Sequence, residues 1–188
     1  MIGYTLGMDR RTLVADAALG IVAGQGMKAL THRAVDVASG SPEGTTSNYF
    51  RTRAALVAAS VDRLEERDLA LWSVGTDETT APPLPDGPEA LAESLAAYVA
   101  ILAGPQADLT RARLVLSLAE PDAVAAGHAR FMRVARGMVE ASGIDRADER
   151  ARWLADYCDG VLLHQLTARR GEPFDRAEAE SAIGRLLA

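Results

Sequence analysis

Apolar residues recur every three or four positions along most of the chain, which is the spacing of amphipathic α-helices. Segments rich in glycine and proline interrupt this pattern, and the longest of them, at about residues 74–88, predicts a loop or linker. The pattern therefore predicts an all-α protein. Its expected helices are 9–25, 31–38, 42–50, 52–73, 89–103, 107–119, 122–142, 145–168 and 175–187.

Polar residues at the ends of the apolar segments predict where several helices begin and stop. Asp9, Thr31 and Asp175 have side chains that accept hydrogen bonds from the first free N–H groups of a helix. Gly26 follows the first segment and suits the left-handed conformation that closes a helix. For the third helix we expect Ser41 as the cap and Pro42 at the first helical position.

The stretch from Thr31 to Phe50 has the layout of a helix-turn-helix. A first helix is followed by Ser39-Gly40-Ser41 and by a short second helix dense in small hydrogen-bonding side chains. A helix-turn-helix places its second helix in the DNA major groove. With Asp16–Leu19, Gly26 and Ala54–Leu56 at matching spacing, residues 9–60 resemble the DNA-binding domain of the TetR family of bacterial transcriptional regulators.

The resemblance implies two domains. Residues 1–51 would form a three-helix helix-turn-helix domain, and residues 52–188 a helical bundle that binds an effector and dimerises. It also implies a ligand-responsive repressor: a homodimer would bind a palindromic DNA operator and be released by a small-molecule effector. The residue types of the short helix agree, because threonine methyls contact thymine and asparagine makes a bidentate contact to adenine.

The candidate DNA-binding residues divide by role. Thr45, Thr46, Ser47 and Asn48 are expected on the outer face, and Gly44 would permit close approach to the groove. Thr31 and His32, at a helix start, and the basic side chains of Lys28 and Arg33 would contact phosphates. By resemblance, the Tyr49 hydroxyl would also donate to a phosphate. One departure is Asp36, where the family usually has a small apolar residue; we expect it to point away from DNA or to pair with a base such as Arg33.

Apolar and aromatic residues in the C-terminal part suggest an effector pocket and a dimer interface, although burial in the protomer's own core is the alternative for both sets. The candidate pocket residues are Trp72, Tyr98, Leu102, Leu114, Leu118, Phe131, Met132, Trp153 and Tyr157. The candidate interface residues are Leu154, Val161, Leu162, Gln165, Leu166, Ile183, Leu186 and Leu187.

Charge and composition narrow the function further. The net charge is −6, yet residues 1–63 hold seven Lys/Arg against five Asp/Glu, which keeps attraction to phosphate local to this end. No secretory signal and no apolar run near membrane-spanning length is visible, so a cytoplasmic protein is expected. Isolated histidines and a single cysteine predict no metal site, and no cofactor is expected.

Two other classes of function remain open from the residues alone. A small helical enzyme is disfavoured, because the chain lacks a glycine-rich phosphate loop and a recognisable nucleophile motif. A helix-turn-helix-like head can also serve a protein-interaction module, or an activator rather than a repressor.

Overall fold

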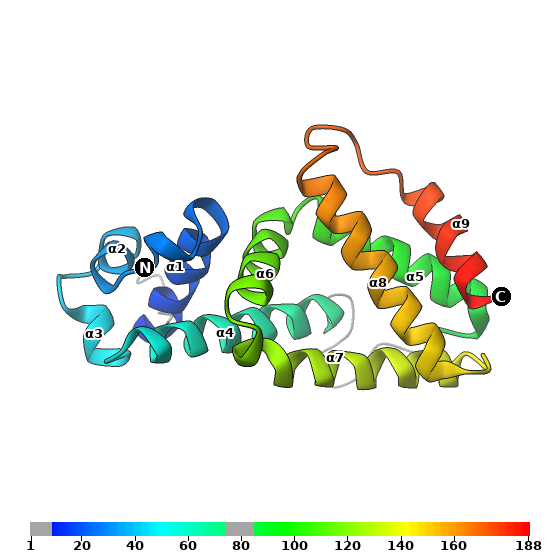
Figure 1. Cartoon of the computed structure of the whole chain (residues 1–188), viewed down its shortest axis with the longest axis horizontal. Helices are drawn as coiled ribbons and strands as arrows, with labels where there is room; N and C mark the ends of the chain where they lie inside the picture. The colour runs from blue at the N-terminus through cyan, green and yellow to red at the C-terminus, as the bar shows by residue number, and fades with distance from the viewer. Residues whose placement is uncertain (1–8, 74–84) are drawn as a thin grey trace, which may run out of the picture. The chain divides into compact units, whose positions relative to one another are not determined.

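The protein is described by a computed structural model that covers residues 9–73 and 85–188, without the side chains of Trp72 and Ser73. In this part of the chain there are nine α-helices, one short 3-10 helix and no strand (Figure 1). The all-α prediction is confirmed. The helices are α1 (Arg10–Gln25), α2 (His32–Ala38), α3 (Thr45–Tyr49), α4 (Arg53–Ser73), α5 (Gly87–Ala103), α6 (Ala107–Ala119), α7 (Pro121–Ala141), α8 (Ala147–Leu166) and α9 (Arg176–Leu187).

Three of the predicted N-terminal caps form as expected. The side chains of Asp9, Thr31 and Asp175 accept hydrogen bonds from the backbone N–H groups two or three residues ahead. Gly26 follows α1 with a positive φ of 76°, but its ψ is 177°, so the predicted left-handed closure does not form there. Most of the predicted loop at 74–88 lies outside the described residues, and α5 begins at Gly87, slightly earlier than predicted.

Packing divides the chain into two compact units. The first holds the residues up to Leu71 together with Arg111–Ala123, and the second holds Trp72–Thr110 and Val124–Ala188. This division differs from the boundary at 51/52 expected from the sequence, because α4 packs with the N-terminal helices.

The first unit is built on the apolar face of α1. Val14, Ala18 and Val22 on α1 are fully buried, as are Val35 on α2 and Leu56 on α4. Helix α1 contacts both α2 and α3. Each of these short helices would be unstable alone, so the common core decides that they are helical.

An ion pair ties α4 to α1. The Arg63 guanidinium donates to both carboxylate oxygens of Asp16, at 2.9 and 3.0 Å, and a further bond at 3.0 Å goes to Glu66 on α4 itself. The bond to Asp16 is the main reason that the pKa of Arg63 is raised, against the opposing effect of burial. The two-oxygen geometry fixes the rotation of α4 against α1.

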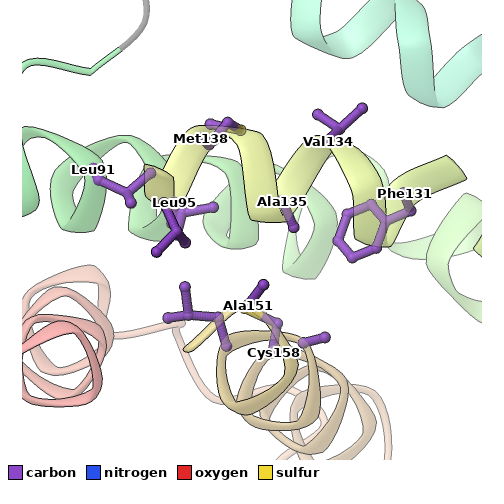
Figure 2. A pocket seen from close by; sticks show the side chains of 11 residues that line it. Leu91, Leu95, Phe131, Val134, Ala135, Met138, Ala151 and Cys158 are labelled. Atoms are coloured by element: carbon purple, nitrogen blue, oxygen red, sulfur yellow. The ribbon is translucent and has the colours of Figure 1, made fainter. Parts of the chain in front are cut away.

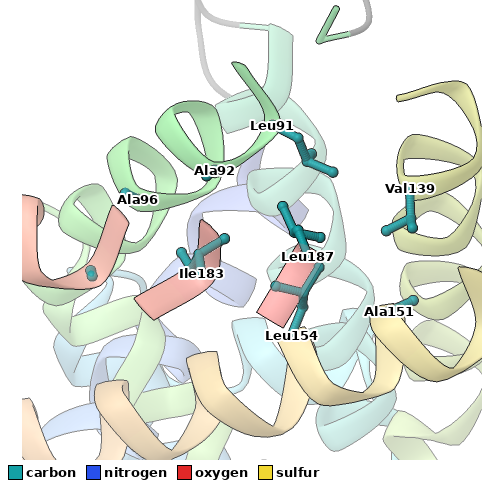
Figure 3. Packing of buried hydrophobic residues seen from close by; sticks show 9 residues of the cluster. Leu91, Ala92, Ala96, Val139, Ala151, Leu154, Ile183 and Leu187 are labelled. Carbon is teal, nitrogen blue, oxygen red and sulfur yellow. The ribbon is translucent and has the colours of Figure 1, made fainter. Parts of the chain in front are cut away.

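The second unit has its core between α5, α8 and α9, with α7 contributing Val139 (Figure 3). Ala92 and Ala96 on α5 are small enough for α9 to pack closely, and Ile183 on α9 is fully buried in that contact region. The buried residues of this core are Leu91, Ala92, Ala96, Val139, Ala151, Leu154, Ala179, Ile183 and Leu187.

None of the described helices is by itself long and apolar enough to cross a bilayer, and only α5 and α6 taken together, bent by 88° at their break, pass by length and composition.

Candidate nucleic-acid interface

The turn between α2 and α3 starts the third helix later than the sequence predicted. The Thr45 N–H donates to the Pro42 carbonyl at 3.1 Å, so Pro42 lies in a turn and not in the helix. Gly44 is the residue before the helix, with φ 89° and ψ −7°, a left-handed conformation. The expected Ser41 cap and Pro42 start are therefore wrong, because the reversal at Gly44 comes between them and α3.

Asp36 supplies the cap that Ser41 does not. Its carboxylate accepts from the Gly44 N–H at 2.7 Å, from the Thr46 N–H at 2.7 Å and from the Thr46 hydroxyl at 2.5 Å. The aspartate is only 4% exposed and lies on α2 beside the buried Val35. Asp36 thus does not pair with Arg33, one of the two alternatives we had expected, but turns inward and joins α2 to the start of α3.

The hydrogen bonds at Asp36 outweigh the cost of burying it. Burial is the largest single effect and raises the pKa of this carboxyl. The bonds from the Thr46 hydroxyl and from the two backbone N–H groups act the other way, and together they hold the pKa below its ordinary value of 3.8. Asp36 is therefore ionised at neutral pH, and its negative charge lies at the N-terminal end of α3, where a helix stabilises it.

His32, one turn before Asp36 on α2, holds the other end of α3. Its Nε2 lies 2.6 Å from the Phe50 carbonyl oxygen, a geometry in which the ring nitrogen donates. Phe50 is 2% exposed, and the Arg11 guanidinium lies 5.0 Å from its ring centroid. Two polar side chains of α2 thus bracket a helix of only five residues.

The exposed side of α3 is formed by Ser47, Asn48 and Tyr49, with Thr45 half-buried. The hydroxyls of Thr45 and Ser47 donate to the backbone carbonyls of Pro42 and Gly44, at 2.7 and 2.9 Å. The side chains of Asn48 and of Tyr49, which is 40% exposed, form no hydrogen bond to the described residues. They are the side chains of this helix best placed to meet another molecule.

Thr46 does not belong to that outer face. It is 0% exposed, and its hydroxyl is bound to Asp36, so it cannot contact a base. We expected a base-facing residue from its polar side chain, but an acid at a core position ten residues earlier was the signal that Thr46 points inward. Asp36 is the functional-site residue that the sequence interpretation missed.

The other predicted contact residues of this unit lie around α2 and α3. Lys28, Thr31 and Arg33 are exposed, while His32 and Gly44 are half-buried. Arg53 at the start of α4 is engaged within the unit, because it donates to the Met27 carbonyl at 2.9 Å and pairs with Glu120 at 3.2 Å.

The predicted pocket residues differ widely in their exposure to solvent. Leu118 is 85% exposed, Leu102 is buried, and the side chain of Trp72 is outside the described part. Trp153 lies under the guanidinium groups of Arg146 and Arg150.

A different apolar pocket forms between α5, α7 and α8 (Figure 2). It includes Phe131, which was predicted as a pocket residue, and Leu154, which was predicted for the dimer interface, but no other residue of either set. The signal for it was the run of apolar residues on one side of α7. The lining residues are Leu91, Leu95, Phe131, Val134, Ala135, Met138, Val139, Ala151, Leu154, Ala155 and Cys158.

Most of the predicted dimer residues are buried in the protomer. Leu154, Leu162, Leu166, Ile183 and Leu187 are each at most 8% exposed. Gln165 is also buried, and its amide donates to the Glu172 carbonyl at 2.7 Å; Val161 and Leu186 are half-buried. The six buried side chains have little surface left for a partner, whereas Leu163 on α8 is 44% exposed.

Comparison with known proteins agrees with this architecture. A protein-family model, described as the tetracyclin repressor-like C-terminal domain, matches residues 86–188 of this chain. A search of curated proteins finds no match.

Solved structures share the fold over nearly the whole chain. A TetR-family member, SCO1917 from Streptomyces coelicolor A3, is 26% identical with a TM-score of 0.77, over 96% of this chain and 99% of its own. The multidrug binding protein EbrR complexed with proflavin is 25% identical with a TM-score of 0.63, over 95% and 100%. A TetR-like regulator from Rhodococcus sp. RHA1 is 16% identical with a TM-score of 0.69, over 95% and 93%.

The family model covers more than half of the chain and matches the part that contains the pocket, while the helix-turn-helix geometry occupies the part before it. Members of this family are DNA-binding regulators of transcription, which sets aside the enzyme alternative. The chain is a transcriptional regulator of the TetR family.

Proposed function

We propose that this regulator is a repressor that binds a palindromic operator as a homodimer and leaves it when a small molecule binds the C-terminal unit. The observation that carries the proposal is the outer side of α3, where Asn48 and Tyr49 project from a helix held at both ends by α2. A bracketed helix presents these groups without paying the entropy of ordering them at the moment of binding.

Reading one half-site with this helix gives limited specificity. An asparagine bidentate to adenine contributes roughly 1–3 kcal/mol of discrimination, and α3 is only five residues long. A two-fold dimer would read two half-sites about 34–36 Å apart, or a multiple of that distance, and thereby double the contacts. The exposed Leu163 on α8 is the apolar side chain we assign to the dimer interface, in place of the buried residues expected from the sequence.

Release by an effector requires different affinities of the ligand for two states of the dimer. Support for a small-molecule ligand comes from EbrR, which shares this fold and whose structures contain ethidium, proflavin and malachite green. The pocket between α5, α7 and α8 is the site we assign to the ligand. The protein acts in the cytoplasm, where its DNA target lies.

The test begins with operator selection from genomic fragments of the source organism, followed by anisotropy titration of a labelled site. Asn48→Ala is expected to weaken binding at least tenfold, since about 1.4 kcal/mol corresponds to one factor of ten. Tyr49→Phe removes only a hydroxyl, and it should weaken binding by a smaller factor. Ser117→Ala, an exposed polar truncation on α6, is the matched control.

Two results would contradict the proposal. One is an unchanged operator affinity in both α3 variants while the circular dichroism spectra are also unchanged. The other is a monomer in sedimentation velocity with and without operator DNA, since a monomer cannot occupy both half-sites.

A further inference from the structure

The pocket of the C-terminal unit is lined without a formal charge. Its eleven side chains come from α5, α7 and α8, and all are hydrocarbon or thioether except the Cys158 thiol (Figure 2). Leu91, Val139 and Leu154 at its base are also core residues. None of the eleven is an acid, a base or an amide.

The pKa of the Cys158 thiol shows that ionisation of this lining residue is unfavourable. Burial, followed by the nearby Asp159, raises the pKa of the thiol to about 12. The sulfur therefore stays a neutral SH at physiological pH. An anionic ligand group at the same place would likewise lose its hydration and would also be repelled by Asp159, while a cationic group would lose its hydration without gaining a counter-ion from the lining.

The size and opening of the pocket limit the ligand in a second way. Its volume is about 40 Å³, whereas benzene occupies engineered apolar cavities of about 150 Å³. A ligand must therefore displace side chains. Phe131 and Val134 are the ones placed to move, since they are 42% and 54% exposed although they line an apolar pocket. Met138 is half-buried and adapts its shape readily.

These observations together point to a ligand class. We infer that the pocket takes a neutral, largely apolar organic molecule that enters beside Phe131 and Val134, and that it discriminates against organic cations. The inference rests on the proposed function for its regulatory meaning, but the binding itself requires neither DNA nor a dimer.

The burial of Leu91, Val139 and Leu154 at the base of the pocket explains the direction of the expected movement. These three are at most 5% exposed; Leu91 and Leu154 lie on α5 and α8, which contact each other and α9, and Val139 packs into the same core from α7. The mouth side of α7 carries the exposed pair Phe131 and Val134. A ligand therefore pushes α7 side chains outward and leaves the α5–α9 core in place.

The experiment is fluorescence titration of the full chain with two probes of similar size. The neutral probe is N-phenyl-1-naphthylamine and the cationic probe is proflavin. The wild-type protein is expected to bind the neutral probe at least tenfold more tightly. Ala155→Glu places a carboxylate in the lining and should reverse this order, whereas Ala126→Glu, the same change at an exposed position of α7, should not.

The outcomes separate the inference from its alternatives. If the wild type prefers proflavin, or binds neither probe, the inference is wrong. Val134→Asp guards against a second explanation: if it turns a dimer into a monomer in sedimentation velocity, the exposed pair belongs to a subunit interface and the inference also fails. Because Ala155→Glu could unfold the unit, Ala155→Leu, which fills the pocket, must also weaken the neutral probe at least tenfold.

The binding result and the proposed function fail independently. If the neutral probe binds but operator affinity does not change, the inferred ligand class stands and release by an effector is refuted. Loss of operator binding in Asn48→Ala, together with proflavin preference in the wild type, would keep the regulator and refute the ligand class.

Discussion

The substitution Asp36→Asn tests whether a buried carboxylate holds the recognition helix in place. Asparagine has the same shape, but one of its two terminal groups is a donor. If the amide oxygen keeps the bonds from Thr46, the NH₂ group replaces the oxygen that accepts from the Gly44 N–H at 2.7 Å in the wild type. Two donors then face each other, and the Gly44 N–H loses its acceptor. The third bond, from the Thr46 hydroxyl, keeps its acceptor but loses the help of the charge.

The magnitude follows from these three bonds. A hydrogen bond to a charged group contributes about 1.5–3 kcal/mol, a neutral one about 0.5–1.5, and a buried donor without a partner costs about 1–3. The variant loses the bond from Gly44 and weakens the two bonds from Thr46, but it no longer buries a charge. Together these changes lower the free energy of unfolding by roughly 2–4 kcal/mol. This is a large fraction of the 5–15 kcal/mol typical of a whole protein.

Hydrogen–deuterium exchange measured by mass spectrometry shows which segments of the chain lose stability in the variant. Peptides covering residues 32–50 should exchange at least about tenfold faster in Asp36→Asn at pH 7, because each 1.4 kcal/mol multiplies the open population by ten. Peptides from α8 and α9 should be unaffected. Asp62→Asn, the same chemical change at an exposed position on α4, is the control.

The pH dependence has a definite sign. A carboxyl whose pKa is lower in the folded than in the unfolded state stabilises the fold above the unfolded value, and this contribution disappears as the pH falls through the folded value. The pKa of Asp36 is lowered from 3.8, so the difference between wild type and variant should be full at pH 7 and should shrink below about pH 3.8. Equal exchange of residues 32–50 at pH 7, or an undiminished difference in strong acid, would refute the reasoning.

Three further predictions concern the same unit. His32→Ala removes the bond to the Phe50 carbonyl, so it should weaken operator binding and speed hydrogen exchange at the end of α3. His32→Gln should be closer to wild type. Equal operator affinity in the wild type and both variants would show that the bond does not position the helix. Gly20→Ala should raise the free energy of unfolding by about 0.5–1 kcal/mol in thermal denaturation, since the site is exposed, helical and free of heavy atoms within 4 Å of a new Cβ. Gly44→Ala, at φ 89°, should do the opposite, and a gain there would contradict the assigned backbone.

The sequence was sufficient for the features that depend on local patterns. Helical periodicity with scarce β-branched residues determined the all-α class, and capping chemistry located the starts of α1, α2 and α9 at Asp9, Thr31 and Asp175. The ordered residues from Thr31 to Phe50 were enough to identify the helix-turn-helix, because its spacing is set by one turn and two short helices.

Tertiary structure decided which side each residue faces. Thr46 was expected on the outer face, but its hydrogen bonds with Asp36 satisfy both polar groups and permit their burial, which no property of either residue reveals alone. The apolar stripes of α8 and α9 were compatible with an interface or a core, and contact with α5 buried most of them in the protomer. The pocket likewise depends on how three helices approach one another, since the same apolar spacing produces a filled core or a cavity according to that approach.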